Sequence, residues 1–292
     1  MKGTEQIGTC AAKKPTRRYT WVGFFCGLLM LAGHSTVGMA EPRTYVIGVV
    51  PQFEPRRTVE IWQPILDQIY LRTGIKLVLR PSPSIPEFEQ QFSDGVFDFA
   101  YMNPYHLLVA NRKQGYRPIL RDVGRELYGI VVVKKDSPLS SVKALDGKKV
   151  AFPAPNSLGA ALIPRAEFKR KFNIKVQELY VKSHSSVYLN VVLGLTEAGG
   201  GIQKTLDRQP KEIRDQLRVL YKTKSVASHP IAVHPRVSRD IRVKLTSAFM
   251  ELGATVQGRS MLADVPFKRI GTTSMKDYYN LRRMRLEAFY VE

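Results

Sequence analysis

The fold of this chain is decided by Lys149-Val150-Ala151-Phe152 and, after three intervening residues, Asn156-Ser157-Leu158-Gly159-Ala160-Ala161. The first run is apolar, the second consists of small and polar residues, and apolar positions at helical spacing follow through residue 172. This order predicts a strand, a loop and a helix start. A strand followed by a helix is the repeating unit of α/β proteins.

The predicted helix start after Asn156 also suggests chemistry. The first N–H groups of a helix have no partner within the helix, and the helix dipole favours negative charge there. Such a start is therefore a potential anion site. Asn and Ser are also common N-cap residues, whose side chains accept a hydrogen bond from their own helix. The local sequence leaves both interpretations, anion loop and helix cap, open.

Strand and helix patterns alternate along the rest of the chain. Asp136-Ser137-Pro138 divides them into two series of units, which predicts an α/β protein with mostly parallel sheets and two lobes. Apolar or alternating runs predict strands at 44–50, 76–80, 97–101, 119–121, 128–133, 149–152, 176–181, 197–199, 218–222 and 231–233. Helical periodicity predicts helices at 59–73, 85–93, 104–113, 160–172, 186–195, 202–208, 238–253 and 275–288. Pro64 lies inside the first helix and predicts a later start or a kink.

The first 40 residues have the pattern of an export signal. Basic residues at 13–18 precede an apolar segment at 21–32, and small residues at 37–40 suit a signal peptidase. The apolar segment is short for a membrane span. We expect a signal peptide at 1–40 that is cut after Ala40, and hence a periplasmic protein. An uncleaved membrane anchor is the alternative.

Composition restricts the chemistry of the exported part. Both cysteines, Cys10 and Cys26, lie in the leader, so we expect no disulfide, zinc-thiolate site or cysteine nucleophile beyond it. Without the leader's five basic and one acidic residues, the formal net charge of +20 becomes +16. This charge favours an anionic partner. Export argues against nucleic acid, which leaves an anionic membrane surface or a small anionic ligand, and most of the charge is expected to form a solvated surface. We expect a small anionic ligand, with no metal and no cofactor.

Ligands of such folds bind beyond the carboxyl ends of strands. The loops there, at 51–57, 101–106, 153–161, 183–186 and 199–201, are rich in neutral donors and aromatic side chains, with Glu54 as their one acid. That composition predicts a site for a small oxyanion held by dipoles. The candidate ligand contacts, including one at the start of the strand at 128–133, are Gln52, Phe53, Tyr101, Asn103, Tyr128, Asn156, Ser157, Leu158, Gly159, Ala160, His184 and Ser185.

Several short motifs occur in a characteristic order. They are Gly48-Val49-Val50-Pro51-Gln52, Trp62-Gln63-Pro64-Ile65-Leu66, Thr73-Gly74, Asp98-Phe99-Ala100-Tyr101, Asp136-Ser137-Pro138-Leu139, Pro155-Asn156-Ser157 and Ser183-His184. Through them, residues 44–253 resemble the phosphate/phosphite/phosphonate-binding family of periplasmic solute-binding proteins, which serve ABC transporters. The resemblance implies the two-lobed, type II periplasmic binding fold, with a β hinge that lets the lobes close over the ligand.

The resemblance also assigns roles to residues. The family's Ser-Thr-Ser anion loop falls on Ser157, Leu158 and Gly159, so only the first hydroxyl is kept. The family's ligand-facing tyrosine and histidine fall on Tyr101 and His184. The acid that receives the ligand's amine in some members has no clear counterpart, because the glycine run at 199–201 occupies that neighbourhood. This implies an oxyanion other than an aminoalkylphosphonate.

Each of these roles has an alternative. Tyr101 could be an ordinary aromatic residue at a strand end, and His184 could cap a helix. The glycines at 199–201 could serve a turn with positive φ. Tyr128 could belong only to the hinge.

The function predicted from these observations is capture of a small oxyanion, such as phosphate, phosphite or a phosphonate, for an ABC transporter. The alternative is a periplasmic sensor of the same fold that signals to a membrane partner such as a sensor kinase. An enzyme is not expected: His229 and His234 are flanked by prolines, and no carboxylate motif accompanies either. We expect a monomer with lobe one at 41–126 plus 230–292 and lobe two, including the hinge strands, at 127–229.

Overall fold

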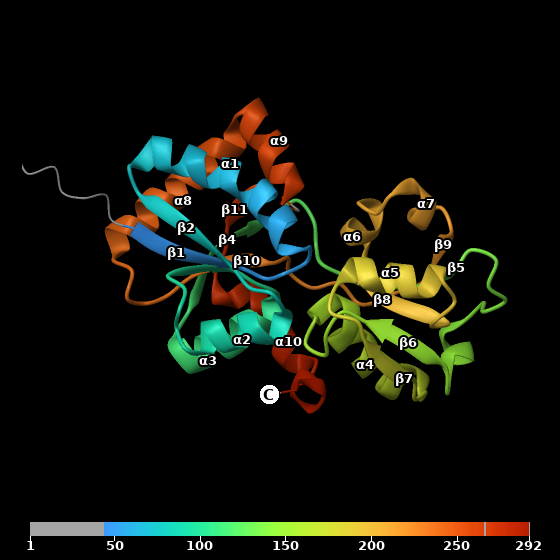
Figure 1. Ribbon diagram of the computed structural model, residues 1–292. Coiled ribbons are helices and arrows are strands. Elements are labelled where there is room, and N and C mark those ends of the chain that lie inside the picture. Colours follow the sequence, from blue (N-terminus) through green and yellow to red (C-terminus); the bar gives the residue numbers. More distant parts are fainter. Residues whose placement is uncertain (1–43, 266, 292) are drawn as a thin grey trace, which may run out of the picture. The chain divides into compact units, whose positions relative to one another are not determined.

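The computed structural model describes residues 44–265 and 267–291; the predicted signal peptide lies outside them. The described residues form two α/β lobes, each built around one sheet (Figure 1). The predicted fold class is confirmed, with both sheets mixed: each is parallel in one half and antiparallel in the other.

The first sheet has six strands in the order β11-β4-β10-β3-β1-β2. Strand β1 pairs in parallel with β2 and β3, and β10 returns antiparallel between β3 and β4. The strands are β1 (Thr44–Val49), β2 (Lys76–Pro81), β3 (Phe99–Tyr101), β4 (Arg117–Asp122), β10 (Pro230–Val233) and β11 (Ile270–Thr272). Strand β11 was not predicted.

Helices cover both faces of this sheet, with α1, α8 and α9 on one and α2 and α3 on the other (Figure 1). Their bounds are α1 (Pro55–Thr73), α2 (Ile85–Ser93), α3 (Pro104–Gln114), α8 (Arg239–Ala254) and α9 (Val256–Asp264). Helix α1 begins before the predicted residue 59, so the suggested later start is wrong. Pro64 is accommodated inside α1 at an exposed position.

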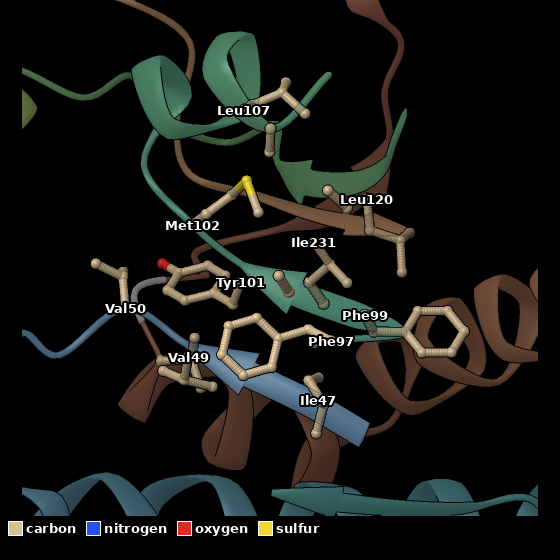
Figure 2. Close-up of a cluster of buried hydrophobic side chains, with 14 of the residues drawn as sticks. Ile47, Val49, Val50, Phe97, Phe99, Tyr101, Met102, Leu107, Leu120 and Ile231 are labelled. Carbon is tan, nitrogen blue, oxygen red and sulfur yellow. The ribbon is translucent and has the colours of Figure 1, made fainter. Parts of the chain in front are cut away.

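Apolar side chains of the central strands form the core of this lobe. Figure 2 shows Ile47 and Val49 of β1, Phe97 and Phe99 around β3, and Ile231 of β10 gathered between the layers. All five are at most 4 % exposed. Burial of apolar surface on this scale is the main stabilising term of a fold, and it holds the carboxyl ends of β1 and β3 in place.

The second sheet has five strands in the order β7-β6-β8-β5-β9. Strand β6 is parallel to β7 and β8, whereas β5 is antiparallel to β8 and β9. The strands are β5 (Gly129–Lys134), β6 (Lys149–Phe152), β7 (Gln177–Tyr180), β8 (Ala198–Ile202) and β9 (Leu217–Lys222).

The glycine run belongs to strand β8, so the prediction of a loop at 199–201 is wrong. Both faces of the strand are too crowded for side chains. A Cβ on Gly199 or Gly201 would collide with Val187 or Tyr188 of the helix above, and a Cβ on Gly200 with the backbone on the opposite face. None of the three glycines has a positive φ. Close packing, not a turn, therefore requires glycine here.

The remaining elements of the second lobe are mostly short. The predicted helix at 160–172 begins earlier and consists of π-helical turns around a short α-helix. Pro164 lacks the N–H needed for a regular helical bond, which accounts for the wider turns before it. The bounds are η1 (Val142–Leu145), η2 (Leu158–Leu162), α4 (Ile163–Glu167), η3 (Phe168–Phe172), α5 (His184–Val192), α6 (Gln203–Asp207) and α7 (Lys211–Arg214).

The C-terminal region contradicts the predicted single helix at 275–288. It forms η4 (Met275–Tyr278), α10 (Tyr279–Arg283) and η5 (Leu286–Phe289). Arg285 adopts a left-handed conformation with φ of 47°, which interrupts the helix. The break lets both Leu281 and Leu286 be buried.

The chain passes between the sheets after β4 and returns before β10. The two passages touch at Leu127 and Val226, which form an isolated antiparallel bridge. Each N–H donates to the other residue's carbonyl at 2.8 Å. Strands β5 and β9 continue from this bridge into the second sheet.

Candidate functional site

A small chamber lies where the loops after the strands of both sheets meet. Its volume is about 20 Å³, room for about one water molecule. None of the described residues that line it carries a formal charge at neutral pH. They are Val50, Pro51, Gln52, Ile85, Asn103, Ser157, Leu158, Gly159, His184, Ile202 and His229. We call this space the inner chamber.

The start of η2 forms one wall of the inner chamber. Ser157 is the N-cap residue of this helix, but its side chain makes no capping hydrogen bond. The N–H groups of Leu158, Gly159 and Ala160 are those that a helix start leaves without an intrahelical partner. Of the two interpretations that the sequence left open, the side-chain cap is not the one observed, and the start of η2 keeps the geometry of an anion site.

His184 reaches the chamber from the first turn of α5. Its ring is buried and Nδ1 lies 3.4 Å from Thr205 Oγ1. Burial lowers the pKa of His184 to about 4, so the imidazole is neutral at pH 7. The cap of α5 is Ser183, whose hydroxyl accepts from the Ser186 N–H at 3.1 Å. His184 therefore does not cap α5, which was the alternative role considered for it.

His229 is a chamber residue that the sequence reasoning considered only as a catalyst. Its Nε2 lies 3.1 Å from Gln52 Nε2, and its ring stacks on Tyr101 with centres 5.4 Å apart. Burial, followed by the nearby imidazoles of His106 and His184, lowers the pKa of His229 to about 3. Its position directly before strand β10 was the one sequence signal that could have placed His229 at the chamber.

A larger outer chamber of about 110 Å³ adjoins the inner one through Gln52, Ile202 and His229. Tyr101 and Tyr128 line it. In contrast to the inner chamber it also has charged walls, formed by Asp122, Arg125, Glu126, Lys204 and Asp207.

Two of these charged residues are constrained by their surroundings. Burial, then repulsion from Arg208 and Arg125, lowers the pKa of Lys204 to about 8, and its ammonium donates to Ala263 O at 2.8 Å. Asp122 accepts backbone N–H bonds from Gly124, Lys268 and Arg269 at 2.8–3.0 Å. The Asp122 carboxylate therefore holds a loop together.

Tyr101 forms an aromatic wall beside the outer chamber. Its ring packs against Trp62, His229 and Phe267 with centres 5.2–5.8 Å apart. Burial raises the pKa of its hydroxyl, which is neutral at pH 7. Figure 2 shows the ring at the end of β3, where it belongs to the buried cluster beside Val50 and Met102.

Asn103 and Asn156 connect the two lobes beside the inner chamber. Asn103 caps α3 through Oδ1 and donates from Nδ2 to Asn156 O at 3.2 Å. The Asn156 amide donates to Glu89 Oε2 at 3.1 Å and to Val291 O at 2.6 Å, and its Oδ1 accepts from Val291 N at 2.9 Å. Both amide hydrogens of Asn156 are thus engaged within the protein.

The predicted contacts divide into three groups. Gln52, Asn103, Ser157, Leu158, Gly159 and His184 line the inner chamber, while Tyr101 and Tyr128 line the outer one. Phe53 and Ser185 share a separate surface pocket. Asn156 and Ala160 are buried and line neither chamber.

Two further features are absent from the described residues. No group of three or more His, Cys, Asp or Glu side chains there could hold a metal ion. No helix within 44–265 or 267–291 is long and apolar enough to cross a membrane. The inner chamber offers hydrogen-bonding groups that are polar and uncharged.

Comparison with known proteins gives the same fold and a family. Residues 47–278 match the family described as "ABC transporter, phosphonate, periplasmic substrate-binding protein". The Phosphonates-binding periplasmic protein of Escherichia coli K12 is 21% identical over 244 residues, which cover 77% of this chain and 71% of that protein.

Solved structures from two other organisms are similar in fold. One is a binding protein component of a phosphonate ABC transporter from Pseudomonas aeruginosa, with a TM-score of 0.77 and 17% identity, covering 84% of this chain and 86% of that one. The other is PhnD1 from Prochlorococcus marinus in complex with methylphosphonate, with a TM-score of 0.76 and 14% identity, covering 85% and 98%.

The matched family consists of binding proteins, which agrees with the expectation that the chain is not an enzyme. The match also covers well over half of the chain. The chain therefore belongs to the family of periplasmic substrate-binding proteins of phosphonate ABC transporters.

Proposed function

We propose that this protein captures a small oxyanion, of the phosphate, phosphite or phosphonate class, in the inner chamber and delivers it to an ABC permease. The observation that carries the proposal is the start of η2, which lies beside a chamber lined by neutral groups. The Ser157 hydroxyl there does not cap its own helix. A helix start of this kind attracts an anion through oriented N–H dipoles.

Each contact has a distinct role in this proposal. Ser157 Oγ and the N–H groups of Leu158 and Gly159 donate to the ligand's oxygens, with His184 as a further neutral partner. Hydrogen bonds to a charged group contribute roughly 1.5–3 kcal/mol each. The hydroxyls missing at Leu158 and Gly159 leave these positions with backbone donors only.

The outer chamber would receive the substituent of an organic ligand. Tyr101 and Tyr128 supply apolar surface there, and Gln52 and His229 lie at the junction of the two chambers. Phosphate or phosphite would leave this space to water.

Capture requires movement, because about 20 Å³ is too small for a tetrahedral oxyanion. We propose that lobe one, residues 41–126 plus 230–292, and lobe two, residues 127–229, part to admit the ligand. The paired passages at Leu127 and Val226 are suited to act as the hinge, since they lie between the two sheets.

The proposed function also implies a processed, exported form of the protein and a membrane partner. We infer that residues 1–40 are removed after Ala40 in the periplasm, which N-terminal sequencing of the exported protein checks. We expect a monomer whose partner is an ABC permease and not a nucleic acid. If the protein instead served a sensor kinase, deleting its gene would abolish a ligand-induced response and leave uptake of the ligand intact.

Calorimetry with phosphate, phosphite, methylphosphonate and sulfate tests the proposed function. Wild-type protein should bind at least one phosphorus oxyanion. Ser157→Ala should weaken that binding about tenfold, the loss of one charged hydrogen bond. Leu158→Thr should strengthen methylphosphonate binding by restoring a donor.

Ser185→Ala is the matched control, because Ser185 lies on the other loop and outside both chambers. Its affinity should equal that of wild type. If Ser157→Ala and His184→Ala both bind the ligand like wild type, the inner chamber is not the anion site. Native mass spectrometry of the purified protein would identify an anion retained from the cell.

A further inference from the structure

The C-terminal tail, residues 284–291, packs on the first lobe. Leu286 is fully buried in the main core cluster. The Tyr290 ring lies against Tyr105 with centres 5.3 Å apart, and its hydroxyl donates to Glu89 Oε1 at 3.3 Å. These contacts fix the tail to helices α2 and α3.

The same tail is also bonded to the second lobe. Arg170 donates from Nη1 to Met284 O at 2.6 Å and from Nη2 to Arg285 O at 2.8 Å. Arg165 donates from Nη1 to Phe289 O at 2.9 Å. The Arg170 guanidinium also lies 4.9 Å from the centre of the Phe289 ring. Because the acceptors are backbone carbonyls, these bonds depend on the course of the tail more than on its side chains.

The last contact of the tail reaches the anion loop. The carboxamide of Asn156 pairs with the backbone of Val291 in both directions, donating at 2.6 Å and accepting at 2.9 Å. Its second amide hydrogen goes to Glu89, which also pairs with the buried His106 at 2.9 Å. Asn156 directly precedes Ser157, so this network fixes the residue from which η2 begins.

We propose that the C-terminal tail is a latch for the inner chamber and that Asn156 is the positioning residue through which it acts. The bonds from Asn156 to Val291 and Glu89 join the two lobes while both lobes line the chamber. These bonds must break when the lobes part. Contacts made only in the closed state raise its population and slow ligand release. The part of the proposal that concerns release rests on the proposed function.

A matched pair of variants at the tail tests the latch in the full-length exported protein. Val291→Pro removes the N–H that Asn156 accepts but keeps the carbonyl, and Tyr290, at φ −76° and ψ 135°, already suits a residue before proline. Val291→Ala keeps both backbone groups and changes only a half-exposed side chain.

Two readouts are compared between the pair. Without ligand, backbone amides of 157–162 should exchange about threefold to tenfold faster in Val291→Pro than in Val291→Ala, as expected for the loss of one hydrogen bond. Release of methylphosphonate, followed by fluorescence of Trp62 beside Tyr101, should accelerate by a similar factor. Val291→Ala should match wild type in both.

Asn156→Leu provides a second variant of similar side-chain size. It removes all three side-chain bonds of Asn156, so exchange and release should accelerate by about tenfold or more. The melting temperature of each variant is recorded alongside. A variant that melts earlier but exchanges at 157–162 and releases ligand like wild type would show that the tail only supports the fold, which overturns the proposal.

The outcomes separate the latch from the proposed function. If wild type binds methylphosphonate and the two Val291 variants behave alike in both readouts, the latch is wrong and the proposed function stands. If wild type binds no phosphorus oxyanion, the proposed function fails, and amide exchange alone still decides on the latch.

Discussion

At the scale of single residues, the inner chamber depends on groups that are polar but uncharged. His184 and His229 are buried, and burial holds the pKa of each well below the ordinary 6.5. Neutral imidazoles can donate or accept one hydrogen bond each without the desolvation cost of a buried charge. Under the proposed function, this chamber would select its anion by the direction of its donors and not by a counter-charge.

The buried imidazoles predict that the protein loses stability in mild acid. The unfolded chain takes up protons on these residues near pH 6.5, whereas the folded chain takes them up near pH 4 for His184 and pH 3 for His229. Their contribution is therefore complete above pH 6.5 and is lost as the pH falls toward 4 and 3. Urea unfolding between pH 7.5 and 5.0 measures the loss.

His229→Gln is the comparison for this measurement, because glutamine keeps a polar group near Gln52 but does not titrate. Its unfolding free energy should fall less than that of wild type over the same pH range. The depressed carboxyl pKa values of Glu60, Asp215 and Asp277 act below this range. Equal slopes for the two proteins would exclude His229 as a source of the acid sensitivity.

At the scale of elements, β8 determines how closely the second lobe can pack. Helix α5 lies against Gly199 and Gly201 on one face, while the carbonyl of Ala160 lies against Gly200 on the other. Ala160 belongs to η2, so the helix whose N-cap residue is Ser157 packs directly against the glycine backbone of β8. The start of η2 and the glycine strand are therefore structurally linked.

Gly200→Ala should destabilise the protein and disturb the start of η2. The added methyl group would collide with Ala160 O and with Phe152, and overpacking of this kind typically costs about 1–3 kcal/mol. Chemical unfolding measures the stability, and calorimetry measures the ligand affinity of the folded variant. Leu195→Ala, at a side chain that is 57 % exposed, is the control. A Gly200→Ala protein as stable as this control would contradict the packing argument.

At the scale of the whole described molecule, polar bonds join the lobes at two separate places. One is the network of the C-terminal tail around Asn156. The other joins α6 to the end of α9, where Arg208 donates to Ala263 O at 3.0 Å and pairs with Asp264 at 2.9 Å. Both places join residues of different lobes, so parting of the lobes would have to break them.

Arg208→Ala should weaken ligand binding modestly by removing the second of these contacts. Because Asp264 is 54 % exposed, its ion pair contributes little, and we expect a loss of affinity of at most about fivefold that shrinks at high salt. Calorimetry at low and high ionic strength measures both effects. Arg214→Ala is the matched control, since Arg214 pairs with Asp215 within the same lobe. Identical affinities for the two variants would remove Arg208 from the closing contacts.

The sequence by itself determined the features that depend on neighbours along the chain. The alternation of apolar runs and helical periodicity predicted all the strands except β11, the two series of units and the helix start at Ser157. These are decided within ten or so residues by side-chain spacing and by residues such as Pro104 and Gly74 at helix ends. The candidate chamber residues on the loops after strands could be predicted from the sequence for the same reason.

Only the tertiary structure decided the features that join distant parts of the chain. His229 lies beside Gln52 across 177 residues, and Asn156 pairs with Val291 across 135. Glycine is required at 199–201 because α5 and η2 pack closely on the two faces of β8, and no local pattern encodes that packing. A glycine run or an Asn looks the same in sequence whether it faces a ligand or another segment, and long-range packing alone distinguishes the two.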